Sequence, residues 1–321
     1  MKTALWWIRR DLRLADNPAL STALDRAERV LPVFVLDPAL WHLPDVGEKR
    51  LAFLLRGLQE LESALRARGS YLVVREGEPL SALSVLVRES GAEMIFAEAD
   101  SSPYARVCDA QVAASLPLSL IEGETVHAPG TISKKNGGPY TVYTPFKYAW
   151  RSLPLPRREE LLPAPERMPT PAGIASAPLP VPPALPGPVL FPPGEIEARR
   201  RLEAFVAEGI ARYAQTRDRM DLSGTSELSP YLCFGMLSAR QAVVVAIEAR
   251  EQPEAREGAQ VWLDELIWRE FYRHILYHFP DVARESFRET LREIPWDSDA
   301  RAFAAWQEGL TGYPAVDAAM R

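Results

Sequence analysis

The chain has 321 residues, enough for about two domains of ordinary size. Hydrophobic residues make up 47% and charged residues 25%, a composition typical of soluble globular proteins. The net charge of −6 gives no support for a nucleic-acid partner, although a local groove can still be positive. The short apolar run at the start is followed at once by Arg9, Arg10 and Asp11. We therefore expect neither a signal peptide nor a membrane span, and a cytoplasmic protein.

The positions of the cysteines and histidines predict neither a disulfide nor a metal site. Cys108 and Cys233 are far apart and lie among apolar neighbours, which favours two buried thiols in a reducing compartment. The four histidines have no spacing typical of metal ligands, so no metal site is expected.

The first ~130 residues alternate apolar runs with helical patterns. Nearly continuous apolar runs predict buried parallel strands at Leu5–Ile8, Leu31–Leu36, Tyr71–Val74, Met94–Ala97 and Leu118–Ile121. Leucines at helical spacing predict a helix over Glu48–Arg68, and Asn17 followed by Pro18 predicts the start of another. This order indicates an α/β domain over residues 1–130, with a doubly wound parallel five-stranded sheet.

Residues 131–194 are interpreted as an interdomain linker. Residues 154–193 contain 14 of the 29 prolines, which excludes regular helix and central strand there. We expect an ordered, irregular segment along the surface.

Residues 195–321 have helical patterns throughout and predict an all-α domain. The expected helices are Glu195–Glu208, Ser238–Arg250 with Ser238 as N-cap, Glu257–Phe279 and Ala300–Gln307. Residues 317–321 are typical of the first turn of one more helix, which suggests that the domain is incomplete at its C-terminus.

A hydroxyl-rich segment precedes one helical stretch. Gly224, Thr225, Ser226 and Ser229 would place backbone N–H groups and hydroxyls where a phosphate could bind. The same residues are also the commonest caps and turns, and from the residues alone a turn without a ligand is the favoured interpretation.

The segment from Trp262 to His274 is the most informative one. On a helical wheel, Trp262, Glu265, Arg269 and Tyr272 share one face, with Trp268 beside it and with Leu263, Ile267 and Phe271 opposite. Aromatic area next to a carboxylate and a guanidinium suits a planar, anionic ligand. A core helix with a Glu265–Arg269 ion pair is the alternative.

Charged residues also follow the first predicted strand. Residues 9–17, RRDLRLADN, would lie at the carboxyl edge of the sheet, where doubly wound folds bind ligands. No G-x-G-x-x-G pattern is present, and an ion-paired loop without a ligand is the favoured interpretation.

In this order, the segments resemble the photolyase/cryptochrome family, and most closely its class I cyclobutane pyrimidine dimer photolyases. The resemblance rests on residues 9–17, on Tyr143-Thr144-Pro145-Phe146, on residues 224–232, on Trp262 through His274, and on residues 306–309 and 311–321. It extends over the whole chain except the proline-rich linker.

The resemblance implies a flavoprotein that repairs pyrimidine dimers in DNA with light. Reduced FAD would pass an electron to the dimer. The implied FAD contacts are Tyr213, Thr225, Ser226, Leu228, Ser229, Trp262, Arg269 and Tyr272. Glu265 would hydrogen-bond the base carbonyls, Trp268 would stack on the extruded dimer, and Arg217 would contact DNA. Trp296 corresponds to the outer tryptophan of the family's electron-transfer chain.

Two finer points follow from the resemblance. A carboxylate at the position of Glu265 resembles the enzymes that act on cyclobutane dimers, whereas relatives that repair (6-4) products usually have an amide at this position. Residues 34–38 and 102–106 look like relatives that bind a deazaflavin or FMN antenna, and Tyr104-Ala105 replaces the Asn-Glu pair of folate-binding relatives. An ordinary strand end and helix start remain the alternative for these two segments.

The family's chains continue well beyond the position of Arg321. The resemblance therefore implies that this chain lacks part of the FAD domain and is inactive by itself, and that the full-length protein is a monomer. The competing function is a cryptochrome-type blue-light sensor that switches binding partners.

Overall fold

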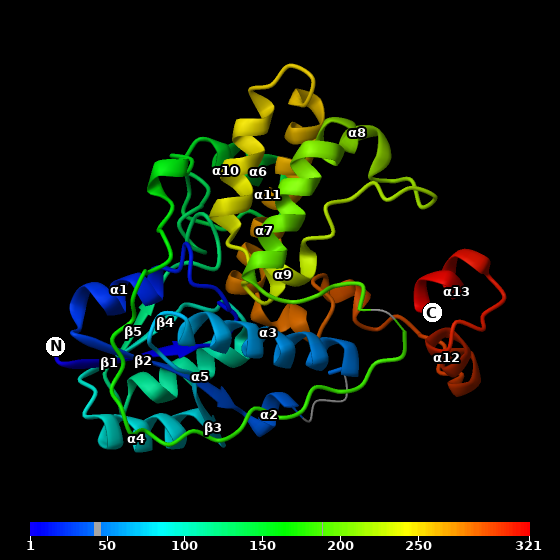
Figure 1. Cartoon of the computed structure of the whole chain (residues 1–321). Coiled ribbons are helices and arrows are strands. Elements are labelled where there is room, and N and C mark those ends of the chain that lie inside the picture. Colours follow the sequence, from blue (N-terminus) through cyan, green and yellow to red (C-terminus); the bar gives the residue numbers. More distant parts are fainter. Residues whose placement is uncertain (42–45, 188) are drawn as a thin grey trace. The chain divides into compact units, whose positions relative to one another are not determined.

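The computed structural model describes residues 1–41, 46–187 and 189–321 (Figure 1). The chain forms two compact units, Met1–Pro280 and Asp281–Arg321. The first unit contains the α/β region and most of the helical region. The helical region predicted from residue 195 onward is thus divided at the end of its longest helix.

The sheet has five parallel strands in the order β3-β2-β1-β4-β5. The strands are β1 (Thr3–Ile8), β2 (Arg29–Leu36), β3 (Val73–Glu76), β4 (Met94–Glu98) and β5 (Leu118–Ile121). The chain starts in the middle of the sheet, moves to one edge and then returns to build the other. The predicted doubly wound architecture is confirmed, with each strand near its expected position.

Both faces of the sheet are covered, because β1 alternates its side chains between two cores. Trp6 and Ile8 lie in a cluster with helices α1 (Pro18–Arg26) and α3 (Glu48–Arg66). Leu5 and Trp7 lie in the other cluster, with α4 (Pro79–Ser90) and α5 (Pro103–Ala113). As predicted, the Asn17 side chain caps α1 by accepting a hydrogen bond from the backbone N–H of Leu20 at 2.9 Å. A short helix, α2 (Pro38–Trp41), follows β2.

The predicted linker contains an unpredicted helix, α6 (Tyr143–Arg151). Pro145 lies in its first turn, where the missing N–H costs no hydrogen bond, so this proline does not exclude a helix. Residues 154–187 and 189–193 are irregular apart from the 3-10 turn η1 (Arg158–Glu160). This segment follows the sheet: backbone N–H groups of Val30 and Ala177 donate to Pro169 and Val74 at 2.8 and 3.0 Å.

The helical part of the first unit packs on the same face of the sheet as α1 and α3. One continuous apolar cluster contains Trp6 of the sheet, Leu58 of α3 and Leu263 and Ile267 of α11. The elements are α7 (Glu195–Ala204), the π-turn η2 (Phe205–Gly209), η3 (Ile210–Arg212), α8 (Tyr213–Thr216), α9 (Ser229–Cys233), α10 (Ala239–Arg250) and α11 (Arg256–His278). The 3-10 turn η4 (Pro280–Ala283) spans the boundary between the two units. The predicted N-cap Ser238 of α10 is confirmed, with a 2.9 Å bond from the N–H of Gln241.

A glycine allows the helical part to approach the loop after β1. Gly235 has φ +64°, and a Cβ at this position would lie 1.9 Å from the carbonyl oxygen of Arg10. The N–H of Leu12 donates to the carbonyl of Phe234 at 3.1 Å beside it. Any side chain at 235 would both strain the backbone and push this loop away.

The second unit contains η5 (Glu289–Leu291), α12 (Ala300–Gln307) and α13 (Pro314–Met320). The helix predicted at 300–307 is confirmed, whereas the helix predicted at 317 starts three residues earlier, because Pro314 occupies its first turn. Asp317 orders the connection by accepting bonds from Thr311 and Gly312 at 2.6 to 3.0 Å.

None of the described helices has the length and apolarity that a membrane crossing requires. Within residues 1–41, 46–187 and 189–321, no three histidine, cysteine or acidic side chains are grouped so that they could hold a metal ion.

Candidate functional site

Helix α11 contains five of the predicted site residues, namely Trp262, Glu265, Trp268, Arg269 and Tyr272. It is 23 residues long, and its buried side includes Leu263, Ile267 and Phe271. The sequence predicted this side correctly. The half-exposed Glu265 and the exposed Tyr272 lie away from it.

Arg217 and Glu265 form an ion pair at this surface. A guanidinium N–H of Arg217, just after α8, donates to Oε1 of Glu265. The bond raises the pKa of Arg217. Both side chains keep about a third of their surface exposed (30% and 37%), so either could exchange this partner for a ligand. The sequence predicted roles for both residues but not that they bind each other.

Tyr213 lies beside this ion pair but faces the interior. It packs edge-on against Phe205 with ring centroids 5.6 Å apart. Burial, followed by the negative charge of Glu265, raises the pKa of its hydroxyl. The structure therefore brings together Tyr213, Arg217 and Glu265, which are up to 52 residues apart in the sequence.

Trp268 is half buried and contacts two other aromatic rings. Its ring lies parallel to that of Tyr143, with centroids 3.5 Å apart and an interplanar angle of 7°. Tyr272, one turn further along α11, lies 5.7 Å away at 24°. Because Glu265 and Trp268 are three residues apart on the helix, a carboxylate and an indole are neighbours on one surface.

Asp264 attaches α6 to α11 at the same place. Its carboxylate binds Lys147 at 3.1 Å and also Arg151, and its backbone carbonyl accepts the hydroxyl of Tyr143 at 2.7 Å. Sequence reasoning missed these partners. The signal that could have found them is the Tyr143-Lys147-Arg151 spacing, which puts an aromatic ring and two cations on one helical face.

The hydroxyl-rich loop is positioned by α8. The backbone of Gly224 lies so close to Thr216 that an added Cβ would be 2.3 Å from its carbonyl oxygen. Beyond it, Thr225 and Ser229 are exposed and Ser226 is half buried. In the part of the chain that the structure describes, their three hydroxyls have no hydrogen-bond partner, so they are available to a ligand.

Two further predicted ligand contacts lie in the core, as Tyr213 does. Trp262 is 3% exposed and packs against Phe205 at 5.0 Å, so it lies in the core although it shares a helical face with Glu265 and Tyr272, and its contact with FAD stays a prediction. An amphipathic wheel cannot place this residue, because η2 packs against the edge of the helix. Leu228 is also buried, which leaves its backbone as the part able to meet a ligand.

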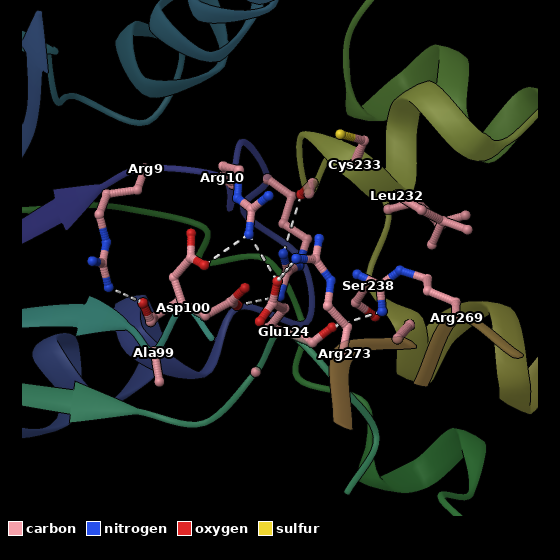
Figure 2. Close-up of a pocket in the computed structure, with 16 residues that line it drawn as sticks. Arg9, Arg10, Ala99, Asp100, Glu124, Leu232, Cys233, Ser238, Arg269 and Arg273 are labelled. Atoms are coloured by element: carbon pink, nitrogen blue, oxygen red, sulfur yellow. Dashed lines mark hydrogen bonds and ion pairs between the residues drawn. The ribbon is translucent and has the colours of Figure 1, made fainter. Parts of the chain in front are cut away.

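Arg269 faces the carboxyl edge of the sheet and not the hydroxyl-rich loop. Its Nη1 donates to the carbonyl of Glu124 at 2.9 Å, and Arg273 and Arg10 bind the Glu124 carboxylate at 3.0 and 2.9 Å. Figure 2 shows these arginines converging on Glu124 around a cavity of about 20 Å³. The cavity has room for about one water molecule. The ion-paired loop predicted for residues 9–17 is thus confirmed, and Arg269 belongs to the same network.

Trp296 lies in the second unit, where its side chain is 79% exposed. Its electron-transfer role stays a prediction.

A second group of polar residues lies where β2 ends. The hydroxyl of Tyr104, in the first turn of α5, donates to the Asp37 carboxylate, which also accepts the N–H of Ala39 at 2.9 Å. Burial raises the pKa of Asp37. Both residues belong to the two segments predicted to bind an antenna, and the neighbouring residues 42–45 lie outside the described ranges.

These residues fit parts of a flavin nucleotide. Free hydroxyls and backbone N–H groups at 225–229 suit a pyrophosphate. Arg217 and Glu265 provide a cation and a hydrogen-bonding carboxyl group on the neighbouring surface, and Trp268 and Tyr272 provide aromatic area.

Comparisons with known proteins give the same family. Residues 4–169 match the DNA photolyase family, and residues 262–321 match the FAD binding domain of DNA photolyase. A deoxyribodipyrimidine photo-lyase of Thermus thermophilus is 40% identical over 323 residues, covering 100% of this chain and 71% of the relative. One from Synechococcus is 37% identical over 334 residues, covering 99% and 69%.

Solved structures agree on the fold. A class III photolyase from Agrobacterium tumefaciens has a TM-score of 0.90 at 28% identity, covering all of this chain and 68% of that one. A cryptochrome from Synechocystis also has a TM-score of 0.90 over all of this chain and 71% of that one. At 23% identity, the cryptochrome supports the fold alone.

Proposed function

The chain belongs to the DNA photolyase family, and we propose that it acts in the light-driven repair of cyclobutane pyrimidine dimers in DNA. The observation that supports this function best is the surface of α11, where the Glu265 carboxyl group held by Arg217 lies beside the stacked indole of Trp268. An extruded pyrimidine offers the two features that this surface recognises, namely a π-face and an edge of carbonyl and N–H groups.

Each residue has a separate part in the proposed reaction. Bound FAD supplies the photoexcited electron donor. Trp268 stacks on the extruded dimer. Glu265 donates a hydrogen bond to a base carbonyl when protonated, or accepts one from a base N–H when ionised. Arg217 exchanges the Glu265 carboxylate for a DNA phosphate, since a guanidinium forms charge-assisted, often paired hydrogen bonds with either group.

The flavin site would be formed by the hydroxyl-rich loop and α11. Thr225, Ser226 and Ser229 would bind phosphate oxygens through hydroxyls and backbone N–H groups. Tyr213, Leu228 and Trp262 would form the apolar wall, since all three are buried next to that loop or α11. Tyr272 would cover the exposed side. Arg269 would have to give up the Glu124 carbonyl to reach a phosphate.

We infer that the end of β2 binds a second, light-harvesting chromophore. A solved photolyase from Sulfolobus tokodaii is described with two FAD molecules that imply a novel light-harvesting cofactor, although at 24% identity its likeness shows the fold alone. In this chain Asp37 and Tyr104 provide a carboxylate and a phenol at the sheet edge where doubly wound folds bind nucleotides. A flavin-type antenna, a deazaflavin or FMN, suits these groups.

The decisive experiment measures dimer loss by chromatography. The protein used is this chain extended to the length of its photolyase relatives, since repair by the chain alone is not expected. It is incubated with FAD, reduced, mixed with an oligonucleotide that has one cyclobutane dimer, and exposed to blue light. We expect the dimer to disappear only with light and flavin, and Glu265→Ala to slow this loss by about tenfold or more, because each such charge-assisted bond is worth about 1.5–3 kcal/mol. A (6-4) substrate should remain intact. Flavin-loaded protein that photoreduces but leaves every dimer intact would favour the light-sensor function instead.

A further inference from the structure

The contact between Tyr143 and Trp268 limits how Trp268 can bind anything else. Parallel rings with centroids 3.5 Å apart are in van der Waals contact over the whole overlap. A base cannot enter between them. Of the two faces of the Trp268 indole, one is therefore already covered, and it is covered by a side chain from α6.

Tyr143 is held in place both at its hydroxyl group and at its ring. Its hydroxyl donates to the Asp264 carbonyl at 2.7 Å, and the ammonium group of Lys147 lies 5.6 Å from the ring centroid. Burial, followed by the charges of Asp264 and Glu265, raises the pKa of the hydroxyl, which therefore stays protonated and able to donate. The ring cannot slide along the indole without breaking this bond.

The anchor and the indole belong to the same helix. Asp264 and Trp268 are one turn apart on α11, and Asp264 also binds Lys147 and Arg151 of α6. The start of α6 is therefore attached to α11 one turn before Trp268, whose indole Tyr143 covers. A movement of α11 would displace the anchor and the indole together, and their stacking would be kept.

We propose that Tyr143 is a positioning residue for damage recognition, which fixes the plane of the Trp268 indole and leaves a single face for an extruded pyrimidine. This inference rests on the proposed function, because it assigns to Trp268 the stacking on damaged bases. Holding an aromatic side chain in its binding orientation before the ligand arrives lowers the entropy lost on binding. Tyr143 acts through Trp268 and does not itself touch the base.

A double-mutant cycle on DNA binding tests the proposal. Affinities are measured for an oligonucleotide with one cyclobutane dimer and for its undamaged copy, using the whole chain. We expect Tyr143→Leu to weaken binding to the dimer by about threefold to tenfold, the factor that corresponds to an aromatic pair, and to leave binding to undamaged DNA unchanged. Tyr143→Phe keeps the stack and should stay within about twofold of the parent.

Making the Tyr143 substitution in a chain that lacks Trp268 distinguishes a positioning role from a general effect on folding. In a Trp268→Leu chain, Tyr143→Leu should have no further effect, because the residue through which it acts is missing. Tyr148→Leu, on the exposed side of the same helix, is the matched control and should change nothing. Equal weakening by Tyr143→Leu in both backgrounds, or equal weakening for both DNAs, would overturn the proposal.

A second measurement needs no DNA. The contribution of Trp268 to near-ultraviolet circular dichroism is the parent spectrum minus that of Trp268→Phe. We expect Tyr143→Leu to remove more than half of this contribution and Tyr148→Leu to retain it. An unchanged contribution in Tyr143→Leu refutes the positioning role whatever the DNA result. A parent chain with the expected dichroism but no preference for the dimer refutes the proposed function instead, and with it the role in recognition.

Discussion

Two groups of charged side chains meet α11, and they differ in how completely they are buried and paired. We call Arg10, Arg13, Glu98, Glu124 and Arg273 the seam cluster, because it joins the carboxyl edge of the sheet to the helical region. Arg13 is fully enclosed and donates to Glu98 at 2.7 Å and to the carbonyls of Asp16 and Gly235 at 3.0 and 3.1 Å. The Arg217–Glu265 pair is partly exposed and has few other partners.

The difference separates a structural role from a functional one. Buried charges need all of their partners, because removing one leaves an unpaired ion in a medium of low dielectric constant. The exposed pair loses little when it opens, since water replaces the lost partner. The seam cluster is therefore suited to fixing the helical region against the sheet, and the exposed pair is suited to exchanging partners with a ligand.

The largest expected effect comes from breaking the seam cluster. Arg13→Met should lower the free energy of unfolding by about 3–5 kcal/mol, because it leaves Glu98 buried without its partner. Chemical denaturation followed by circular dichroism measures this loss. Arg66→Met, which removes an exposed ion pair on α3, is the control and should change stability little. Similar unfolding midpoints for the two variants would contradict the structural role of the cluster.

A pH dependence of similar size is expected from Glu270. This residue of α11 is buried between Arg269 of its own helix, the N–H of Val126 and Trp150 of α6, with His274 one turn away. Burial is the main cause that raises its pKa from 4.5 to about 7. Between these two values the folded protein holds a proton that the unfolded chain releases. Stability from this group is therefore complete below about pH 4.5 and is lost as the pH rises through 7.

The measurement compares the parent with Glu270→Gln, which keeps the hydrogen-bonding shape but cannot ionise. The stability of the parent relative to the variant should fall by up to about 3 kcal/mol between pH 4.5 and pH 7.5, as a shift of about 2.5 pH units implies. His274 has the opposite dependence, because burial lowers its pKa to about 4, but it is present in both proteins and cancels. A constant difference across this range would mean that Glu270 remains ionised in the fold.

The same comparison explains what the sequence could and could not predict. The sheet and the buried side of α11 follow from local apolar patterns, which fix strands such as β2 and the face containing Leu263 and Ile267. The placement of Arg269 against Glu124, 145 residues away, depends on tertiary packing that no local pattern encodes. The burial of Trp262 could not be predicted for the same reason, because a wheel does not show that Phe205 covers that edge of the helix. The stacking of Tyr143 on Trp268 required a helix inside a segment interpreted as linker.

The smallest expected change in stability comes from opening the exposed pair. Arg217→Met should lower the free energy of unfolding by no more than about 1 kcal/mol, since Glu265 is more than a third exposed and water can replace its partner. The same substitution should weaken binding to damaged and undamaged DNA to the same extent and reduce the salt dependence of binding, because an arginine that contacts phosphate contributes without regard to sequence. Fluorescence titrations at two salt concentrations measure both effects. A loss of stability comparable to that of Arg13→Met would place Arg217 and Glu265 with the seam cluster, as part of the framework, and would remove the physical reason for expecting this pair to open for a ligand.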